Sequence, residues 1–304
     1  MAGALMGKVV AVTGAGRGIG REVALLCSAE GAAVIVNDLG VSVEGDGQDG
    51  TVADQVVAEI RAAGGRAWAN SANIAAPAEA QTIVDDALSQ FGRLDAVVNN
   101  AGIMRDRIFH KLSQADWQAV IDVNLHGTFN VTKAAALAFR EQGSGAFVHF
   151  TSTSGLIGTF GQANYSASKM AVVGLSNSIA RDMERFGVRS NCVAPFAWSR
   201  LTASIPVETE ADRARVERIR KMSADKVAPL VAFLCADASK EFNGQVFAVR
   251  RNEVYLFSQP RPIRTIHNSE GWTVERLAEI AVPAFRTGLT PLEHSPQVFA
   301  WDPI

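Results

Sequence analysis

Cysteine is scarce in this sequence, whose 304 residues include only Cys27, Cys192 and Cys235. The three are widely spaced, odd in number and set in apolar surroundings, so they do not suggest the disulfide framework of a small secreted protein. We interpret them as reduced residues of the hydrophobic core. Neither the cysteines nor the five histidines form a cluster with metal-ligand spacing, so we predict no metal site.

Two further absences narrow the class of protein. The net charge of −2 argues against a general nucleic-acid-binding protein. No apolar run is long enough to cross a bilayer, and residues 1–8 lack the basic start and long apolar core of a secretory signal peptide. We therefore expect no nucleic-acid or membrane partner, and a cytoplasmic location.

The composition is that of a soluble globular protein, with 48% hydrophobic and 20% charged residues. Short apolar strands alternate with helical patterns over the first 250 residues. Strands are predicted at 8–12, 33–38, 66–69, 94–98, 146–150, 188–194 and 245–250. Helices are predicted after residue 20 and at 51–63, 77–91, 116–140, from about 161, and at 226–236. This alternation predicts an α/β fold, a doubly wound parallel sheet of the Rossmann type with ligands at the carboxyl ends of the strands.

A glycine-rich turn follows the first strand and precedes the first helix. Gly14, Gly18 and Gly20 give the spacing Gly-x-x-x-Gly-x-Gly within residues 13–20. Glycines let the backbone approach a pyrophosphate, whose charge is favoured by the free N–H groups of a helix start. The alternative, a turn without a ligand, explains poorly why the turn lies between a strand and a helix.

An acidic residue, Asp38, ends the second strand about 20 residues after that turn. It is placed to accept hydrogen bonds from an adenosine ribose, and it would repel a 2′-phosphate, so it favours NAD over NADP. The alternative is an ordinary polar strand end.

Three polar groups near the middle of the chain suit one piece of chemistry. Ser152 follows an apolar strand, and Tyr165 and Lys169 share one face of the next predicted helix. A phenol with a pKa of about 10 is a poor base at neutral pH, and a neighbouring ammonium favours its ionised form. Ser152 would hydrogen-bond the substrate oxygen. The alternative is a packed ring and a solvated lysine.

Asn124 interrupts the apolar pattern of the long helix predicted at 116–140. A buried amide needs partners, since leaving it unsatisfied costs about 1–3 kcal/mol. It would either satisfy a local backbone kink or fix a water beside Lys169.

The last part of the chain has a different character. Residues 200–222 are polar and suit either a mobile helical lid or a solvated helix pair. Six of the ten prolines and several aromatic residues lie beyond Arg251, with one short helix expected at 272–280. We therefore divide the chain into a domain of residues 1–250 and an extension of residues 251–304, which we expect to pack on the core or on a neighbouring subunit and to line the substrate cleft.

Taken together and in order, these motifs resemble the classical short-chain dehydrogenase/reductase family over roughly residues 6–250. Within that family the sequence is most similar to the hydroxyacyl-CoA dehydrogenase domain of peroxisomal multifunctional enzymes, and those domains are also similar to hydroxysteroid dehydrogenases. The similarity is carried by Val36–Gly40, Asn99–Arg107, Phe160–Lys169 and Val227–Val231.

The resemblance implies roles for single residues. Tyr165 would exchange a proton with the substrate, Lys169 would lower its pKa and hold the nicotinamide ribose, Ser152 would position the substrate oxygen, and Asn124 would order a water. The implied cofactor is NAD, held by Gly14, Arg17, Gly18, Ile19, Gly20, Asp38, Asn73, Ile74, Asn100, Ala101, Gly102, Tyr165, Lys169 and Pro195.

The sequence departs from the family at several places. Pro195-Phe196 replaces a common Pro-Gly, and Asn73-Ile74 stands where an aspartate and an aliphatic residue are usual near the adenine. The extension lies outside the common pattern, and residues 301–304 do not resemble a peroxisomal address.

The resemblance implies an NAD-dependent dehydrogenase that oxidises a secondary alcohol, with a 3-hydroxyacyl-CoA or related bulky acyl-CoA as substrate and a homodimer or homotetramer as assembly. Arg105, Arg107, Arg200, Arg261 and Arg264 are candidates for binding the CoA phosphates, unless they are solvated surface charges. A hydroxysteroid is the alternative substrate. A non-catalytic NAD-sensing protein is the alternative class, and it is disfavoured because all four catalytic positions are filled.

Overall fold

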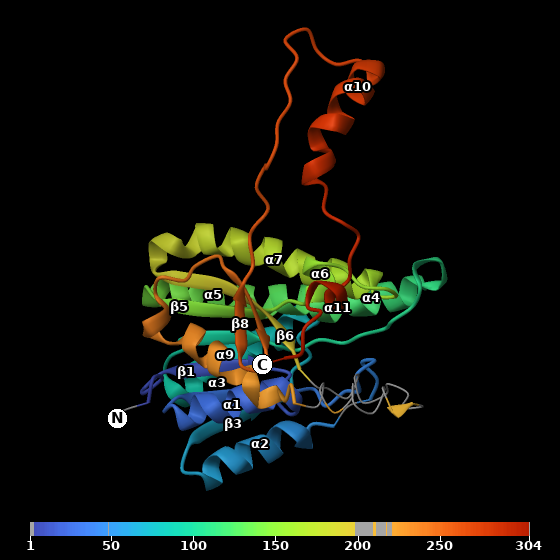
Figure 1. Cartoon of the computed structure of the whole chain (residues 1–304). Helices are drawn as coiled ribbons and strands as arrows, with labels where there is room; N and C mark the ends of the chain where they lie inside the picture. Colours follow the sequence, from blue (N-terminus) through green and yellow to red (C-terminus); the bar gives the residue numbers. More distant parts are fainter. Residues whose placement is uncertain (1–2, 48, 198–208, 211–216, 218–220, 304) are drawn as a thin grey trace.

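An eight-stranded sheet with helices on both faces forms the body of this computed structural model (Figure 1). The structure describes residues 3–47, 49–197, 209–210, 217 and 221–303. The predicted lid or helix pair at 200–222 therefore lies almost wholly outside the described residues. The strand order is β3-β2-β1-β4-β5-β6-β7-β8, and all neighbours are parallel except β7 and β8.

The predicted alternation is confirmed. The strands are β1 (Val9–Thr13), β2 (Ala33–Asn37), β3 (Arg66–Asn70), β4 (Ala96–Asn99), β5 (Gly145–Phe150), β6 (Val188–Phe196), β7 (Val246–Arg250) and β8 (Glu253–Leu256). The main helices are α1 (Gly18–Ala29), α2 (Thr51–Ala62), α3 (Pro77–Phe91), α4 (Gln114–Ile121), α5 (Thr128–Gln142), α6 (Thr153–Leu156), α7 (Ala163–Met183), α9 (Ala228–Cys235), α10 (Val274–Phe285) and α11 (Ser295–Val298).

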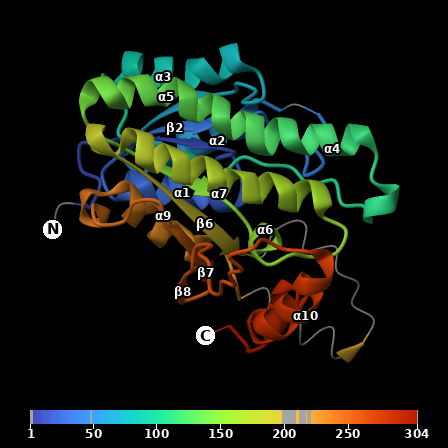
Figure 2. The ribbon, with the colours of Figure 1, turned by 90° about the horizontal axis from the view of Figure 1, so that it is seen from above.

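Two hydrophobic layers sandwich the sheet. On one face, side chains of α1, α2 and α9 pack on Val10, Val12, Val34 and Val36 of the central strands. On the other face, α3 and α5 cover the alternate residues of the same strands, and α7 continues this layer beside α5 (Figure 2). Both faces being covered explains why the strands are apolar throughout instead of alternating. Cys27, Cys192 and Cys235 are free and buried, as predicted.

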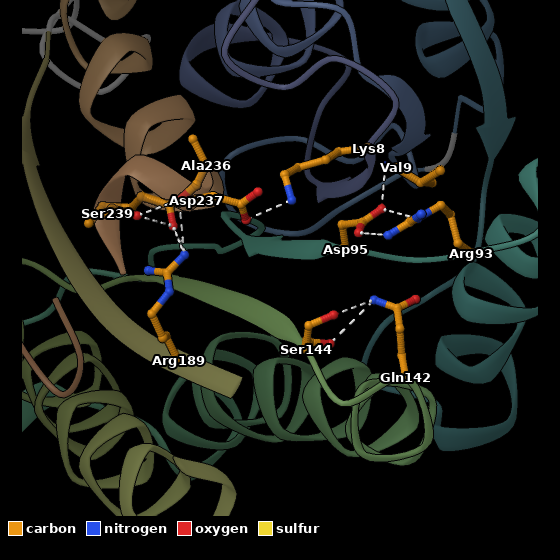
Figure 3. Close-up of polar contacts among 11 residues, drawn as sticks. Lys8, Val9, Arg93, Asp95, Gln142, Ser144, Arg189, Ala236, Asp237 and Ser239 are labelled. Carbon is orange, nitrogen blue, oxygen red and sulfur yellow. Dashed lines mark hydrogen bonds and ion pairs between the residues drawn. The ribbon is translucent and has the colours of Figure 1, made fainter. Parts of the chain in front are cut away.

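Ion pairs close the amino-terminal edge of the sheet, opposite the glycine turn (Figure 3). Arg93 makes two bonds of 2.8 and 2.6 Å to the carboxylate of Asp95, which also accepts the backbone N–H of Val9 at 2.8 Å. Arg189 donates to the carbonyls of Leu234 and Ala236 at the carboxyl end of α9. These contacts fix strand ends, and the candidate site lies at the opposite, carboxyl edge.

One strand is longer than predicted. The sequence indicated a stop before Pro195, but β6 continues to Phe196, with Pro195 opposite Val249 of β7. The pairing with β5 ends at Val193, so the missing N–H of Pro195 breaks no bond to that neighbour.

Another strand was not predicted. β8 turns back on β7 through Arg251 and Asn252, and Arg251 has a left-handed backbone with φ 58°. Such turns usually carry glycine, and its absence removes the sequence signal for a hairpin. The strand prediction that ended at Arg250 was therefore incomplete.

After β8 the chain leaves the body, forms a projecting arm (residues 258–294) that contains α10, and returns through α11 (Figure 1). The returning end is anchored: Phe299 is 8% exposed and contacts the rings of Phe196 and Tyr255. Arg250 donates to the carbonyl of Trp301. In the described part of the chain, the main packing partner of α10 is the short turn that follows it, not the body.

Candidate active site

Backbone angles and close contacts favour glycine at three positions of the glycine turn. Gly14 and Gly18 have φ of 62° and 54°, values that favour glycine. A Cβ on Gly14 would lie 2.8 Å from Cα of Ala101, and one on Gly20 would lie 2.2 Å from the carbonyl oxygen of Gly14. No atom lies within 4 Å of a Cβ on Gly18, so the turn is open there. Arg17 precedes the first residue of α1, and Ile19 packs on the core beneath.

The segment after β4 locks onto this turn. The side-chain amide of Asn100 donates to the carbonyls of Thr13 and Gly14 at 3.0 and 2.9 Å. The hydroxyl of Thr13 accepts the N–H groups of Asn100 and Ala101, both at 3.2 Å. β1 and β4 are adjacent in the sheet, and the chain order reverses between them. A crevice opens at such a point in doubly wound sheets.

Asp38 follows β2 and faces the same turn. Its carboxylate accepts the N–H of Gly16 at 2.8 Å and the N–H of Gly40 at 2.7 Å. The acidic group is therefore fixed beside the glycines by backbone bonds, at the position that the sequence indicated.

Other predicted cofactor residues have structural roles as well. The Asn73 side chain accepts the N–H of Ala75 within its own turn, at 3.0 Å. Ile74 is buried, and its side chain closes against Gly127, where a Cβ would lie 2.6 Å from it. Because the Ile74 side chain is used in the core, only its backbone is available to a ligand.

Tyr165 and Lys169 lie one turn apart on α7, as predicted from their spacing. The Nζ atom of Lys169 is 5.7 Å from the centre of the Tyr165 ring and donates to the carbonyl of Phe150 at 2.9 Å. Lys169 is only 3% exposed, and burial lowers its pKa to about 8.

Ser152 stands at the carboxyl end of β5, just before α6. Its hydroxyl accepts the N–H of Ser154 at 3.1 Å and so caps that short helix. It also hydrogen-bonds the hydroxyl of Tyr165, which lowers the pKa of the phenol. The hydroxyls of Ser152 and Tyr165 are thus brought together.

The pKa of Tyr165 differs in direction from the prediction. Burial raises it to about 12, hydrogen bonding to Ser152 opposes the rise, and the negative charge of Asp106 adds to it. The sequence led us to expect a lowered value because of Lys169. That expectation was wrong for the protein alone, because it ignored the cost of burying a phenolate.

Asn124 lies in a π-helical turn, Asp122–Gly127, which separates α4 from α5. The predicted single helix at 116–140 is therefore interrupted where the asparagine sits. Its amide does not satisfy this turn but binds the segment after β4: Oδ1 accepts from Ile103 N at 2.8 Å, and Nδ2 donates to Ile103 O at 3.1 Å. A Cβ on Gly102 would lie 3.1 Å from this Oδ1 and 3.5 Å from Lys169 Nζ, so both groups converge there.

Sequence reasoning missed His149, a fully buried histidine in β5 below the site. Its two ring nitrogens lie 3.1 Å from Asn99 Nδ2 and 3.1 Å from Ser190 Oγ. Burial lowers its pKa to about 3, so the ring is neutral. A polar residue at a central position of an apolar strand was the available signal.

The site thus unites a glycine turn, an acidic group and a Ser-Tyr-Lys cluster at the carboxyl edge of a doubly wound sheet. This combination defines a dinucleotide-binding oxidoreductase of the α/β class. Among the described residues no cluster of acidic, histidine or cysteine side chains is placed to hold a metal ion. None of the helices described combines the length and apolar character needed to span a bilayer.

Comparison with known proteins identifies the family. The family model described as short chain dehydrogenase matches residues 8–205, more than half of the chain. The chain belongs to the short-chain dehydrogenase/reductase family.

Curated relatives match about four fifths of the chain. A Mycobacterium tuberculosis protein named as a short-chain type dehydrogenase/reductase is 45% identical over 81% of this chain and 83% of its own. The mouse peroxisomal multifunctional enzyme type 2 is 44% identical over 80% of this chain. The match spans only 31% of the length of that enzyme. A Synechocystis 3-oxoacyl-[acyl-carrier-protein] reductase is 40% identical over 81% of this chain and 96% of its own.

A solved structure matches more of the chain. A short chain dehydrogenase from Mycobacterium avium is 35% identical, with a TM-score of 0.83, and the match covers 95% of this chain and 98% of that one. The match therefore extends into residues 251–304.

Proposed function

We propose that this protein is an NAD-dependent dehydrogenase that oxidises a secondary alcohol to a ketone. The observation that carries the proposal is the convergence of Ser152, Tyr165 and Lys169 at the end of β5, with the glycine turn at the neighbouring strand ends. The chemistry of the family supports it, because all its relatives compared above are named for redox reactions or as multifunctional enzymes.

The glycine turn fits a nicotinamide dinucleotide. Positive φ at Gly14 and Gly18, and the open space over Gly18, leave the backbone accessible to a pyrophosphate at the start of α1. When bound, the oxidised cofactor supplies the hydride acceptor and a positive charge that favours an ionised phenol. The residues proposed to hold it are the glycine turn, Asp38, Asn73, the backbone of Ile74, Asn100–Gly102, Pro195, and Tyr165 with Lys169.

The chain's own groups handle the proton. Tyr165 accepts the proton of the substrate hydroxyl, and Ser152 hydrogen-bonds the same oxygen while charge develops on it. The Lys169 ammonium stabilises the phenolate and binds the nicotinamide ribose. Asn124 holds the segment after β4 in place beside Lys169, and we propose that a water bound there relays the proton.

We assign NAD, not NADP, because of Asp38. Its carboxylate lies against Gly16 and Gly40, where it would accept ribose hydroxyls and repel a 2′-phosphate.

The substrate we propose is a 3-hydroxyacyl-CoA or a related bulky acyl-CoA. Exposed apolar side chains lie on the two segments that meet just before α7, the helix that carries Tyr165. These side chains are Ile108, Phe109 and Phe160, which are 49%, 76% and 80% exposed. Such side chains suit an acyl chain. Of the arginine candidates, Arg105 is engaged with Asp46 and Asp116, whereas Arg107 donates to its neighbouring carbonyl of Asp106, so Arg107 is the better one for a phosphate. Arg261 and Arg264 belong to the projecting arm, and Arg200 lies outside the described residues.

A 17β-hydroxysteroid is the alternative substrate, since the same apolar side chains suit a steroid. The alternative class is a non-catalytic NAD-binding protein. In such a protein Ser152 and Tyr165 would have no catalytic role.

We further propose that the protein is a homodimer or homotetramer in which the arm of one subunit packs on its neighbour. The apolar residues Val274, Leu277 and Val282 of α10 are exposed. The arm's two ends contact its own body, where Gln259 donates to the carbonyl of Gly244 and the His294 ring lies 5.7 Å from the ring of Phe160. Free, buried cysteines fit the cytoplasmic location that we propose.

The test is NADH formation with 3-hydroxyacyl-CoAs of several lengths and one 17β-hydroxysteroid, each with NAD and with NADP. Turnover of thioesters with NAD alone is the expected result, and turnover of the steroid alone would overturn the substrate. Tyr165→Phe should abolish turnover while NAD binding, measured by calorimetry, persists. Near wild-type turnover by this variant would refute the assignment of the base. Binding of NAD by the wild type without turnover of any substrate in the panel would support the non-catalytic class.

A further inference from the structure

The loop of residues 39–47, which we call the strap, follows Asp38 and reaches across the carboxyl edge of the sheet. It starts at the end of β2, where Asp38 accepts the N–H of Gly16 in the glycine turn at 2.8 Å. Its tip bonds the segment after β4: Met104 N donates to Val43 O at 3.0 Å. In the sheet, β1, which leads into the glycine turn, lies between β2 and β4. The strap therefore bridges the glycine turn from one side to the other.

The tip of the strap is a tight turn that packs on Ile103. Ser42 N donates to Asp46 O at 2.8 Å, and Gly45 N donates to Ser42 O at 3.1 Å. Gly45 has a left-handed backbone with φ 89°, and a Cβ there would lie 2.9 Å from Cδ1 of Ile103. The tip thus meets the segment after β4 with its backbone, and a larger residue at Gly45 would push the two apart.

Arg105 fastens the tip from the side of that segment. Its Nε donates to Glu44 O at 2.8 Å, and its Nη2 lies 3.4 Å from Oδ1 of Asp46. Its Nη1 lies 3.7 Å from Oδ1 of Asp116 in α4. The side chain of Asn164, in the first turn of α7, donates to Arg105 O at 3.0 Å. Two helices of the body therefore hold Arg105, and its guanidinium holds the strap.

We propose that Arg105 is a positioning residue for the cofactor: it latches the strap across the glycine turn, and the latched strap slows the departure of the bound nicotinamide dinucleotide. The inference rests on the proposed function, in which the glycine turn and Asp38 hold that cofactor. It adds that the contacts between the strap and residues 103–105 must break before the cofactor leaves.

The strength of the latch indicates the size of its effect. Its contacts are one hydrogen bond from a guanidinium to a carbonyl, one backbone bond, one part-exposed ion pair and the packing of one glycine. A latch of this kind opens and closes readily, so it sets a rate of release. The bonds that fix Asp38 go to Gly16 and Gly40, not to the tip, so opening the latch should leave this carboxylate in place.

The experiment measures the rate at which NADH leaves the full chain, by stopped-flow fluorescence with an excess of NAD as competitor. The variants are Arg105→Met and Gly45→Ala, which weaken the latch from opposite sides. Lys111→Met is the control for charge, since Lys111 is exposed and follows the same segment. Gly47→Ala is the control for backbone strain. Gly47 also has a left-handed backbone, with φ 82°, but a Cβ there meets no atom of the described residues within 4 Å.

We expect NADH to leave about fivefold faster from Arg105→Met, because a guanidinium bond and a part-exposed ion pair are lost. It should leave about threefold faster from Gly45→Ala, and at the wild-type rate from both controls. Hydrogen exchange of the cofactor-free chain reports the latch itself. The N–H of Met104, which bonds Val43, should exchange faster in Arg105→Met and Gly45→Ala than in the wild type or the controls.

An unchanged dissociation rate in Arg105→Met, or an equal rise in Lys111→Met, would overturn the proposal. So would a rise in the association rate alone, because a strap that only obstructs entry does not retain the cofactor. Should Arg105→Met fail to fold, the comparison of Gly45→Ala with Gly47→Ala decides: equal rates in the two would overturn the proposal.

Failure of the proposed function is distinct, because it appears without any change to the strap. A wild type that binds no NADH would overturn the proposed cofactor and this inference with it. A wild type that binds NADH and releases it at the same rate as Arg105→Met would overturn this inference alone.

Discussion

Replacing Lys169 with methionine should make the protein more stable at neutral pH while it abolishes turnover. Lys169 is a buried ammonium with no carboxylate among its bonded partners; its Nζ donates to the carbonyl of Phe150. Burial lowers its pKa from 10.5 to about 8. At about 1.4 kcal/mol per pKa unit, holding the proton in the folded chain costs about 3 kcal/mol. Methionine has a similar length and no charge.

The net gain is smaller than that cost, because methionine leaves the Phe150 carbonyl without the lysine. A lost partner for a buried carbonyl costs about 1–2 kcal/mol. We therefore expect Lys169→Met to raise the free energy of unfolding by about 1–2 kcal/mol at pH 7, or a few degrees in Tm.

The gain should depend on pH with a defined sign. Below pH 8 the lysine is protonated in both the folded and the unfolded chain, so the wild type bears the whole cost. Between about pH 8 and 10.5 the folded chain releases its proton before the unfolded chain does, so wild-type stability rises and the advantage of the variant disappears.

The assay is thermal unfolding of the wild type and Lys169→Met at pH 7 and at pH 10, with Lys133→Met on the exposed surface of α5 as the control. The variant should melt higher at pH 7 only, and the control should show no such difference. A variant that melts lower than the wild type at pH 7, or a gain that is equal at both pH values, would refute the reasoning.

Three further predictions follow from other parts of the structure. The pKa of His149 is about 3 in the folded chain and 6.5 ordinarily, so between these values the unfolded chain binds a proton that the folded chain does not. The free energy of unfolding of the wild type should therefore fall as the pH drops from 6.5 towards 3. Urea unfolding of His149→Asn should show a flatter pH dependence. Asp38→Ser should lower the KM for NADP relative to that for NAD at least about tenfold, measured by steady-state kinetics, and an unchanged ratio would contradict the role of this carboxylate. The two strands of chain that lead into and out of the arm lie close together, since the rings of Phe257 and Phe299 are 6.4 Å apart, so residues 262–290 can be replaced by a short Gly-Ser linker. This variant should remain folded but form smaller assemblies in light scattering. An unchanged assembly would argue against the arm as a subunit contact.

Helix α3 shows what the sequence allowed us to predict of the fold. Its bounds, Pro77–Phe91, agree with the prediction, because proline is favoured at a helix start and Gly92 ends the helix with a left-handed backbone. Tyr165 and Lys169 were likewise found because helical spacing is a local property.

Features that depend on distant neighbours were missed or wrong. β6 passes through Pro195 because β5 has already ended beside it, and β8 forms because β7 has a free edge. Neither feature can be predicted from the residues of β6 or β8 alone. The direction of the Tyr165 pKa failed for the same reason, since burial and the charge of Asp106 come from segments outside α7.

The buried polar groups of the candidate site lower the stability of the fold. Lys169 and His149 each have a lowered pKa, so each disfavours the protonated form inside the sheet domain. A design for stability alone would replace them with apolar side chains. Two apolar layers on a continuous sheet supply the stability against which these costs are set. Both groups that cost folding free energy therefore lie at and beneath the carboxyl end of β5, where the chemistry is proposed. Only Lys169 could be predicted from the sequence, because it lies one helical turn from Tyr165.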